Sequence, residues 1–193
     1  MKERALRFFR LAEQYSEAAL LLLDTLFDNG NSNAGIGKTM EEAYIQMEKN
    51  SIKSDLYLFI PALFNCLQST ELFLKGILLL NETEFDNKHE VQKLLEKLKV
   101  IYGDNSSIYK EFYGVYSFQT NIIKQYKKDN EITNTHDLYI SLRYPEHKGR
   151  EYNYSSLFCN GARGCDLFRK LRNNIEKIKN TVLREFRETY WAE

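Results

Sequence analysis

Residues 30–39 read GNSNAGIGKT, and this stretch decides between two fold classes. A glycine-rich turn that ends in Gly-Lys-Thr and leads into a helix resembles the phosphate-binding loop of α/β nucleotide hydrolases. In that motif the first glycine lies five residues before the second, and this chain has Ser32 at that distance from Gly37. The motif also follows a buried strand, because the amides of the turn must converge on phosphate oxygens. Residues 15–27, YSEAALLLLDTLF, are instead rich in Leu and Ala and keep a helical period, so we interpret the stretch as a loop between two helices.

Apolar residues recur at steps of three and four along most of the chain, which is typical of amphipathic helices. A capping-box pattern from Thr39 to Glu42 starts one helix, Ser54 is placed to cap another, and Ser106 or Ser107 is placed to cap a third. The expected helices cover residues 3–27, 40–50, 55–80, 89–102 and 108–128, with Pro61 inside the third as a kink or a later start and Gly103 ending the fourth. A C-terminal helix of about six turns carries apolar residues from Phe168 to Val182.

Residues 129–160 break this pattern with short alternating pieces, LYISLRY and EYNYSSLF, and with the second proline. We therefore expect an irregular segment with a small hairpin before the last helix. No alternation of strands and helices and no internal repeat is found, so the predicted fold is an all-α bundle of about five helices.

The composition indicates one domain over residues 1–193. Lys and Arg total 27, as do Asp and Glu, so the whole molecule has no electrostatic attraction to nucleic acid or to an anionic membrane. The longest apolar run, residues 18–23, is far short of the ~20 residues that cross a bilayer. The first residues, MKERALRFFRLAEQ, place charges among the apolar positions, unlike a signal peptide. Three cysteines without framework spacing agree with a cytoplasmic protein.

Residues of the types that bind zinc occur in and beside the irregular segment: His136, His147, Cys159 and Cys165. Their separations of eleven, twelve and six positions match no compact zinc module, which pairs ligands two to five positions apart. We expect no metal site and no cofactor.

A set of polar residues in a fixed order resembles the signature of the HEPN domain family. Gln68, Glu71 and Lys75 lie on the long apolar helix, Lys88-His89-Glu90-Val91 opens the next one, and Arg143-Tyr144-Pro145 precedes the last. The resemblance covers roughly residues 3–190, with its specific marks between residues 64 and 145. It implies a bundle of four or five helices that is usually dimeric and often encoded beside a minimal nucleotidyltransferase. Some members of the family are RNA-cutting toxins or antiphage effectors.

We expect the signature residues to have a structural role. Glu71 and Lys75 are four residues apart in the favourable order for a helical ion pair. In a central helix their charges would need further partners, because burying an unpaired charge is costly. His89 and Arg143 are the partners we expect, so that the group ties the long helix to the Arg-Tyr-Pro segment.

The ribonuclease branch of the family carries an Arg, then a polar residue, then a His that is separated from the Arg by four to six intervening residues. This chain has Arg172-Asn173, but Lys177, Ile178 and Lys179 stand where the His should fall. Cutting RNA by attack of the 2′-hydroxyl needs a group that exchanges a proton near pH 7, and the pKa of a lysine would have to fall by about three units to serve. We therefore expect Arg172, Asn173 and Lys177 to hold a phosphate or the carboxylate of a partner, or to be plain solvated residues of the outer face.

Two further features bear on nucleic acid. Residues 163–188 carry eight Lys and Arg against four acids, and aromatic residues are dense between residues 102 and 158. A basic helix beside stacking rings is a feature of single-stranded RNA binding, but Tyr is also favoured at protein interfaces, which is the interpretation we prefer.

Three hypotheses follow. The first is a non-catalytic HEPN-like protein that forms a homodimer and binds a partner protein or a nucleotide or RNA phosphate, as part of a toxin–antitoxin or antiphage system. The second is a HEPN-type ribonuclease in which Arg172, Asn173 and Lys177 form an atypical active site. The third is a nucleotidase of the phosphate-binding-loop type, which would use Lys38.

Overall fold

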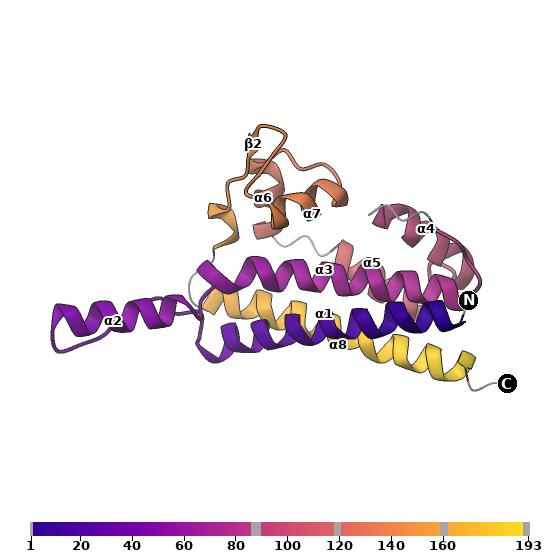
Figure 1. Ribbon diagram of the computed structural model, residues 1–193, viewed down its shortest axis with the longest axis horizontal. Helices are drawn as coiled ribbons and strands as arrows, with labels where there is room; N and C mark the ends of the chain where they lie inside the picture. The colour runs from indigo at the N-terminus through magenta and orange to yellow at the C-terminus, as the bar shows by residue number, and fades with distance from the viewer. Residues whose placement is uncertain (1, 86–89, 118–120, 159–161, 191–193) are drawn as a thin grey trace.

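The computed structural model describes residues 2–85, 90–117, 121–158 and 162–190. Three long helices, α1 (Lys2–Asp28), α3 (Asp55–Leu80) and α8 (Ala162–Tyr190), lie side by side and form the body of the molecule (Figure 1). The shorter helix α4 (Val91–Tyr102) packs against α3, and α5 (Ser107–Tyr116) packs against α3 and α8. The all-α bundle predicted from the sequence is confirmed.

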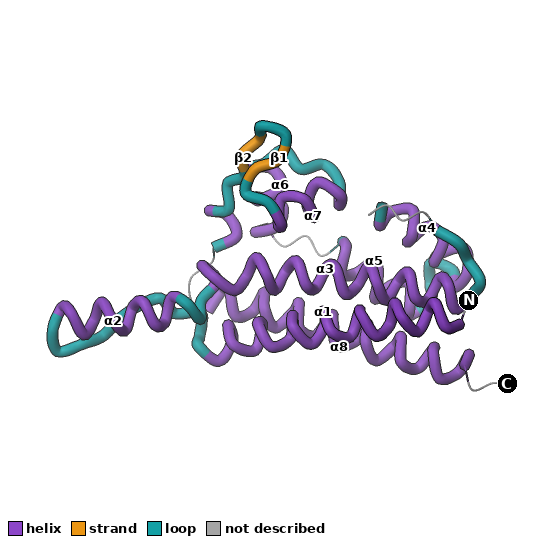
Figure 2. The backbone as a smooth tube through the Cα atoms, in the orientation of Figure 1, coloured by secondary structure: helices purple, strands orange, loops and turns teal. Residues whose placement is uncertain are grey.

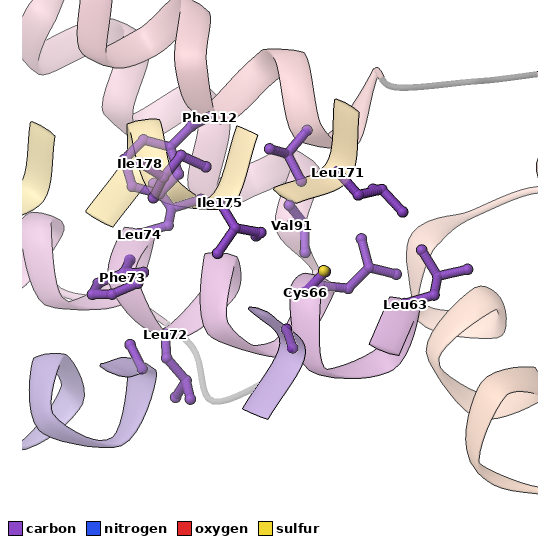
Figure 3. Packing of buried hydrophobic residues seen from close by; sticks show 14 of the residues in the cluster. Leu63, Cys66, Leu72, Phe73, Leu74, Val91, Phe112, Leu171, Ile175 and Ile178 are labelled. Atoms are coloured by element: carbon purple, nitrogen blue, oxygen red, sulfur yellow. The ribbon is translucent and has the colours of Figure 1, made fainter. Parts of the chain in front are cut away.

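Helix α3 is the centre of the core, with most of its residues buried on all sides. Gly76 allows α1 to approach closely, because a Cβ at this position would lie 2.2 Å from Cε1 of Phe9. The ring of Phe9 in turn meets the edge of Phe186 on α8 at a centroid distance of 5.6 Å. Ile175 and Ile178 of α8 lie beside Leu74 of α3, and Leu171 lies nearer Cys66 and Leu63 (Figure 3). The apolar stripe that the sequence predicted for the C-terminal helix therefore packs against the core.

The segment between α5 and α8 contains more helix than we expected. The predicted helix over 108–128 is two helices, α5 and α6 (Asn121–Asp129), and residues 118–120 between them lie outside the described part of the chain. Residues predicted as an alternating, strand-like piece form α7 (Thr135–Arg143). The side chain of Asn134 caps this helix by accepting from the amide of Asp137 at 2.8 Å.

The small hairpin is confirmed. Strands β1 (Glu146–His147) and β2 (Arg150–Glu151) pair antiparallel (Figure 2). Lys148 and Gly149 have φ angles of 52° and 75°, the left-handed conformation of a two-residue hairpin turn. A single turn of 3-10 helix, η1 (Ser155–Leu157), follows and packs on α6.

Helix α2 (Met40–Ser51) begins at the predicted cap, where Thr39 accepts from the amide of Glu42 at 3.2 Å. The carboxylate of Glu42 accepts from the amide of Lys38 at 2.8 Å, one residue earlier than an ordinary capping box would place it. Ser54 lies at the start of α3, but its hydroxyl donates to the carbonyl of Ser51 and caps nothing. The loop thus joins two helices, as predicted.

Among the residues that the structure describes, one stretch, Met40–Leu80, contains a window apolar enough to cross a membrane by length and composition. In the structure 83% of that window is buried, mainly because α3 is surrounded by α1, α4, α5, α7 and α8. A core helix of a bundle passes the same test.

Candidate functional site

Helix α8 carries Arg172, Asn173 and Lys177, the residues that correspond to the active site of the ribonuclease branch. Its buried stripe contains Leu171, Ile175, Ile178 and Val182, all 2% exposed or less. Arg172 lies beside this stripe at the edge that faces α1, and its side chain is 37% exposed.

The guanidinium of Arg172 is held by two carboxylates. Its Nε donates to Oδ1 of Asp24 on α1 at 2.6 Å, and a terminal nitrogen lies 2.8 Å from Oε2 of Glu176 one turn further along α8. The hydrogen bond to Asp24 raises the pKa of Arg172 above its usual value, and the charge of Glu176 acts in the same direction. Because two carboxylates already balance the charge of Arg172, an incoming phosphate has to compete with them for the guanidinium.

These residues line a shallow groove of about 530 Å³ between α1 and α8. A second ion pair, Lys179 with Glu17, crosses the same groove. The lining contains three acids and two bases and consists of Glu17, Leu20, Leu21, Asp24, Arg172, Glu176, Lys179 and Asn180. A groove lined by three acidic and two basic side chains does not attract a polyanion.

Asn173 and Lys177 are exposed and lie four residues apart on a face of α8 next to this groove. Lys177 is five residues from Arg172, which places the two side chains about 140° apart around the helix axis. The structure therefore brings Arg172 together with Asp24 and Glu176. Asn173 and Lys177 lie on the adjacent face of α8. Neither lines the groove.

The other polar group lies inside the bundle, on α3. Nζ of Lys75 and Oε1 of Glu71 are 2.6 Å apart, and the two side chains are 7% and 1% exposed. The ammonium group of Lys75 also lies 5.6 Å from the centre of the Phe85 ring, a cation–π contact. This is a buried ion pair in the fold's central helix.

Two tyrosines complete the environment of Glu71. The hydroxyl of Tyr139 on α7 interacts with the carboxylate of Glu71 and with the hydroxyl of Tyr116 on α5. Burial raises the pKa of both tyrosines well above the usual value, and the charge of Glu71 adds to the effect. The phenols therefore stay protonated and link α5 and α7 to the central helix.

The expected tie to the Arg-Tyr-Pro segment is corrected in one respect. Arg143 is exposed, donates to the hydroxyl of Tyr144 at 3.1 Å and stacks on its ring, so it is not the partner of Glu71. The partner is Tyr139, one turn earlier on α7, because Arg143 sits at the exposed end of that helix. Pro145 ends the segment, with its carbonyl accepting from Tyr152 at 2.9 Å.

Two further signature positions complete the set. Gln68 is half-buried on α3, one turn before Glu71. His89, with Lys88, lies outside the described residues.

The residues considered as zinc ligands lie in different elements: His136 on α7, His147 on β1 and Cys165 on α8, while Cys159 lies outside the described residues. Within the described ranges no group of three His, Cys, Asp or Glu side chains comes together around a common point.

An open cleft of about 920 Å³ lies between α4, α5, the last turn of α6 and the beginning of α7. Its polar lining includes Lys127 and His136, and its aromatic lining Tyr113 and Tyr116. The sequence did not predict this cleft, because residues of four helices (α4, α5, α6 and α7) and of the loop before α7 form it. Spacing along one helix gives no sign of such a site.

Several of the aromatic residues between 102 and 158 belong to the core. Phe112, Tyr126 and Tyr139 are buried, and Tyr154 stacks on Tyr126 at 5.8 Å. Tyr113 and Tyr144 are the exposed large aromatics among the described residues of this region. Most of the rings thus stabilise the packing of α5, α6 and α7.

The comparison with protein families agrees with the geometry. The model of the HEPN domain matches residues 38–185, which is most of the chain. The chain belongs to the HEPN domain family. Helix α1 precedes the matched region, although it packs on α3 and α8 and supplies Glu17 and Asp24 to the groove. No curated protein and no solved structure matches the chain.

Proposed function

We propose that this chain is a non-catalytic HEPN-domain protein that acts by binding, as a homodimer, within a toxin–antitoxin or antiphage system. The observation that supports the proposal best is the pairing of Arg172. Its guanidinium is shared between Asp24 and Glu176, and the positions where the family's histidine should fall carry Lys177, Ile178 and Lys179. Lys177 has no imidazole ring, which is the side-chain group that accepts and returns protons near pH 7.

The balance of charge in the groove favours a protein partner over an RNA strand. Three carboxylates and two cations offer ion pairs of both signs to another protein surface, whereas a phosphate backbone would meet the acids. A nucleotidyltransferase encoded nearby is the kind of partner that this family context implies.

The experiment is incubation of the purified protein with a mixed RNA pool, alongside Arg172→Ala and Lys177→Ala. We expect no cleavage above background with any of the three. Cleavage by the unaltered protein that disappears in Arg172→Ala would overturn the proposal and favour a ribonuclease with an atypical active site.

Nucleotide binding is a second candidate function, supported by the cleft between α4, α5 and α7. Lys127 and His136 supply cationic or hydrogen-bonding groups for a phosphate, and Tyr113 supplies an exposed ring for a base. Titration calorimetry with a set of nucleotides tests it, because a genuine site loses affinity in Lys127→Ala and keeps it in the groove variant Arg172→Ala.

A further inference from the structure

Residues 32–54 leave the bundle and return to it at the same point. The side chain of Asn31 closes this excursion, donating to Oδ2 of Asp55 at 3.0 Å and accepting from the amide of Asp55 at 2.7 Å. Both residues are fully buried. Figures 1 and 2 show the excursion, with α2 as its helix, projecting from one end of the three long helices. We call residues 32–54 the arm.

The arm is held in shape by contacts between its loop and α2. A Cβ on Gly35 would lie 1.8 Å from the carbonyl oxygen of Ala43, so the loop packs backbone against backbone on α2. The side chain of Asn50 donates to the carbonyl of Ala34 at 2.7 Å, which fixes the beginning of the loop against the last turn of α2. These contacts give the arm a defined shape.

Yet α2 buries none of its residues. Large apolar side chains are exposed along the arm and at its base: Ile36 90%, Met40 88%, Tyr44 64%, Ile45 45%, Met47 40%, Ile52 54%, Leu56 40% and Tyr57 61%. A helix of this length is marginal in water without tertiary packing. An exposed apolar set of this density marks an interaction surface.

The two faces of α2 differ. The loop covers the side that carries Ala43, Met47 and Asn50. Positions two residues away from Ala43 and Met47 lie on the opposite side of the helix. That free face carries Glu41, Ile45, Lys49 and Ile52, spaced by four, four and three residues.

The charged residues of the free face can form ion pairs with the same residues of a second copy of the chain. Glu41 lies one turn before Ile45 and Lys49 one turn after it. If a second copy of α2 lies antiparallel with its Ile45 against this Ile45, each Glu41 faces the Lys49 of the other copy. Antiparallel helices also place opposite ends of their dipoles together. The same patch then serves both subunits, as a twofold interface requires.

We infer that the arm pairs with the arm of a second copy of this chain, antiparallel about a twofold axis at Ile45, with reciprocal Glu41–Lys49 ion pairs around an apolar centre. The inference rests on the homodimer of the proposed function and names the surface that forms it. Because the arms project from the bundles, they meet without requiring contact between the bodies.

Charge reversal gives a sharp test. Glu41→Lys alone sets Lys against Lys twice, and Lys49→Glu alone sets Glu against Glu twice, so sedimentation equilibrium should show dimer dissociation constants raised by at least about tenfold. An equimolar mixture of the two variants restores both complementary pairs and should form a heterodimer as tight as the unaltered dimer. The double variant Glu41→Lys/Lys49→Glu should dimerise with itself.

Ile45→Asp should leave the protein monomeric while its circular dichroism stays unchanged, because Ile45 lies outside the core. The matched control is Val100→Asp on α4, where an equally apolar and 86% exposed side chain lies far from the arm along the chain. It should dimerise like the unaltered protein. A dimer insensitive to Ile45→Asp and to both charge reversals would overturn the arm interface but leave the homodimer standing. A protein monomeric at all concentrations would overturn both, whereas RNA cleavage would affect only the non-catalytic assignment.

Discussion

Replacing Glu71 by Ala should destabilise the fold more than any surface ion pair could. The change leaves the ammonium group of Lys75, whose side chain is 7% exposed, without its carboxylate and removes a partner of the Tyr139 hydroxyl. Breaking a buried pair on one side costs about 3–5 kcal/mol. For a chain of this length each kcal/mol lowers Tm by about 2–4 °C, so we expect a fall of about 6–20 °C in differential scanning calorimetry.

Two comparisons isolate the cause. Glu3 and Arg7 on α1 form a pair with the same i,i+4 spacing but with side chains 84% and 73% exposed, so Glu3→Ala should leave Tm essentially unchanged. Replacing both partners by apolar residues of similar size, in Glu71→Leu/Lys75→Met, should recover most of the loss, because no unpaired charge remains. An unaltered melt for Glu71→Ala would refute the structural role of this group.

Three further changes test other parts of the structure. Gly76→Val should lower the free energy of unfolding by about 1–3 kcal/mol in urea titrations, because its side chain overlaps the Phe9 ring between α1 and α3. Gly35→Ala should disorder the arm and abolish dimer formation in sedimentation experiments while the melt of the bundle is kept, and a dimer of normal affinity would contradict this. Stability should also fall in alkali: burial raises the pKa of Cys66 from 9.0 and of Tyr102 from 10.0 to about 12. Both groups therefore favour the folded state fully below about pH 9 and lose that contribution as the pH rises toward 12, which urea titrations at a series of pH values should reveal.

The long helices could be predicted because their signals are local and repeated. Residues 3–27 and 55–80 carry many apolar positions at helical spacing, and caps such as Thr39 and Ser106 are read within four residues. Helix α7 was missed because its β-branched and aromatic residues alternate over a short stretch. Burial of Leu138, Tyr139 and Leu142 and the cap at Asn134 outweigh that local preference.

Only those contacts of the site that lie within one helix could be predicted from the sequence. The Glu71–Lys75 pair follows from spacing, but the assignment of Arg143 as their partner failed because the choice between Tyr139 and Arg143 depends on the direction of α7. Asp24 is 148 residues away from Arg172, and no pattern in the chain links them. Contacts between distant helices depend on packing angles that the sequence does not display.

The closure at Asn31 and Asp55 has an evolutionary consequence. Since the excursion starts and finishes at one spot, a gene could lose these codons, or acquire different ones, while the neighbouring long helices keep their places. An exchange of these residues would change the surface that the arm offers to a partner without changing the scaffold. Recombinants that join Asn31 to Asp55 through a tight turn should therefore fold, and would give a self-sufficient scaffold on which other protrusions can be grafted.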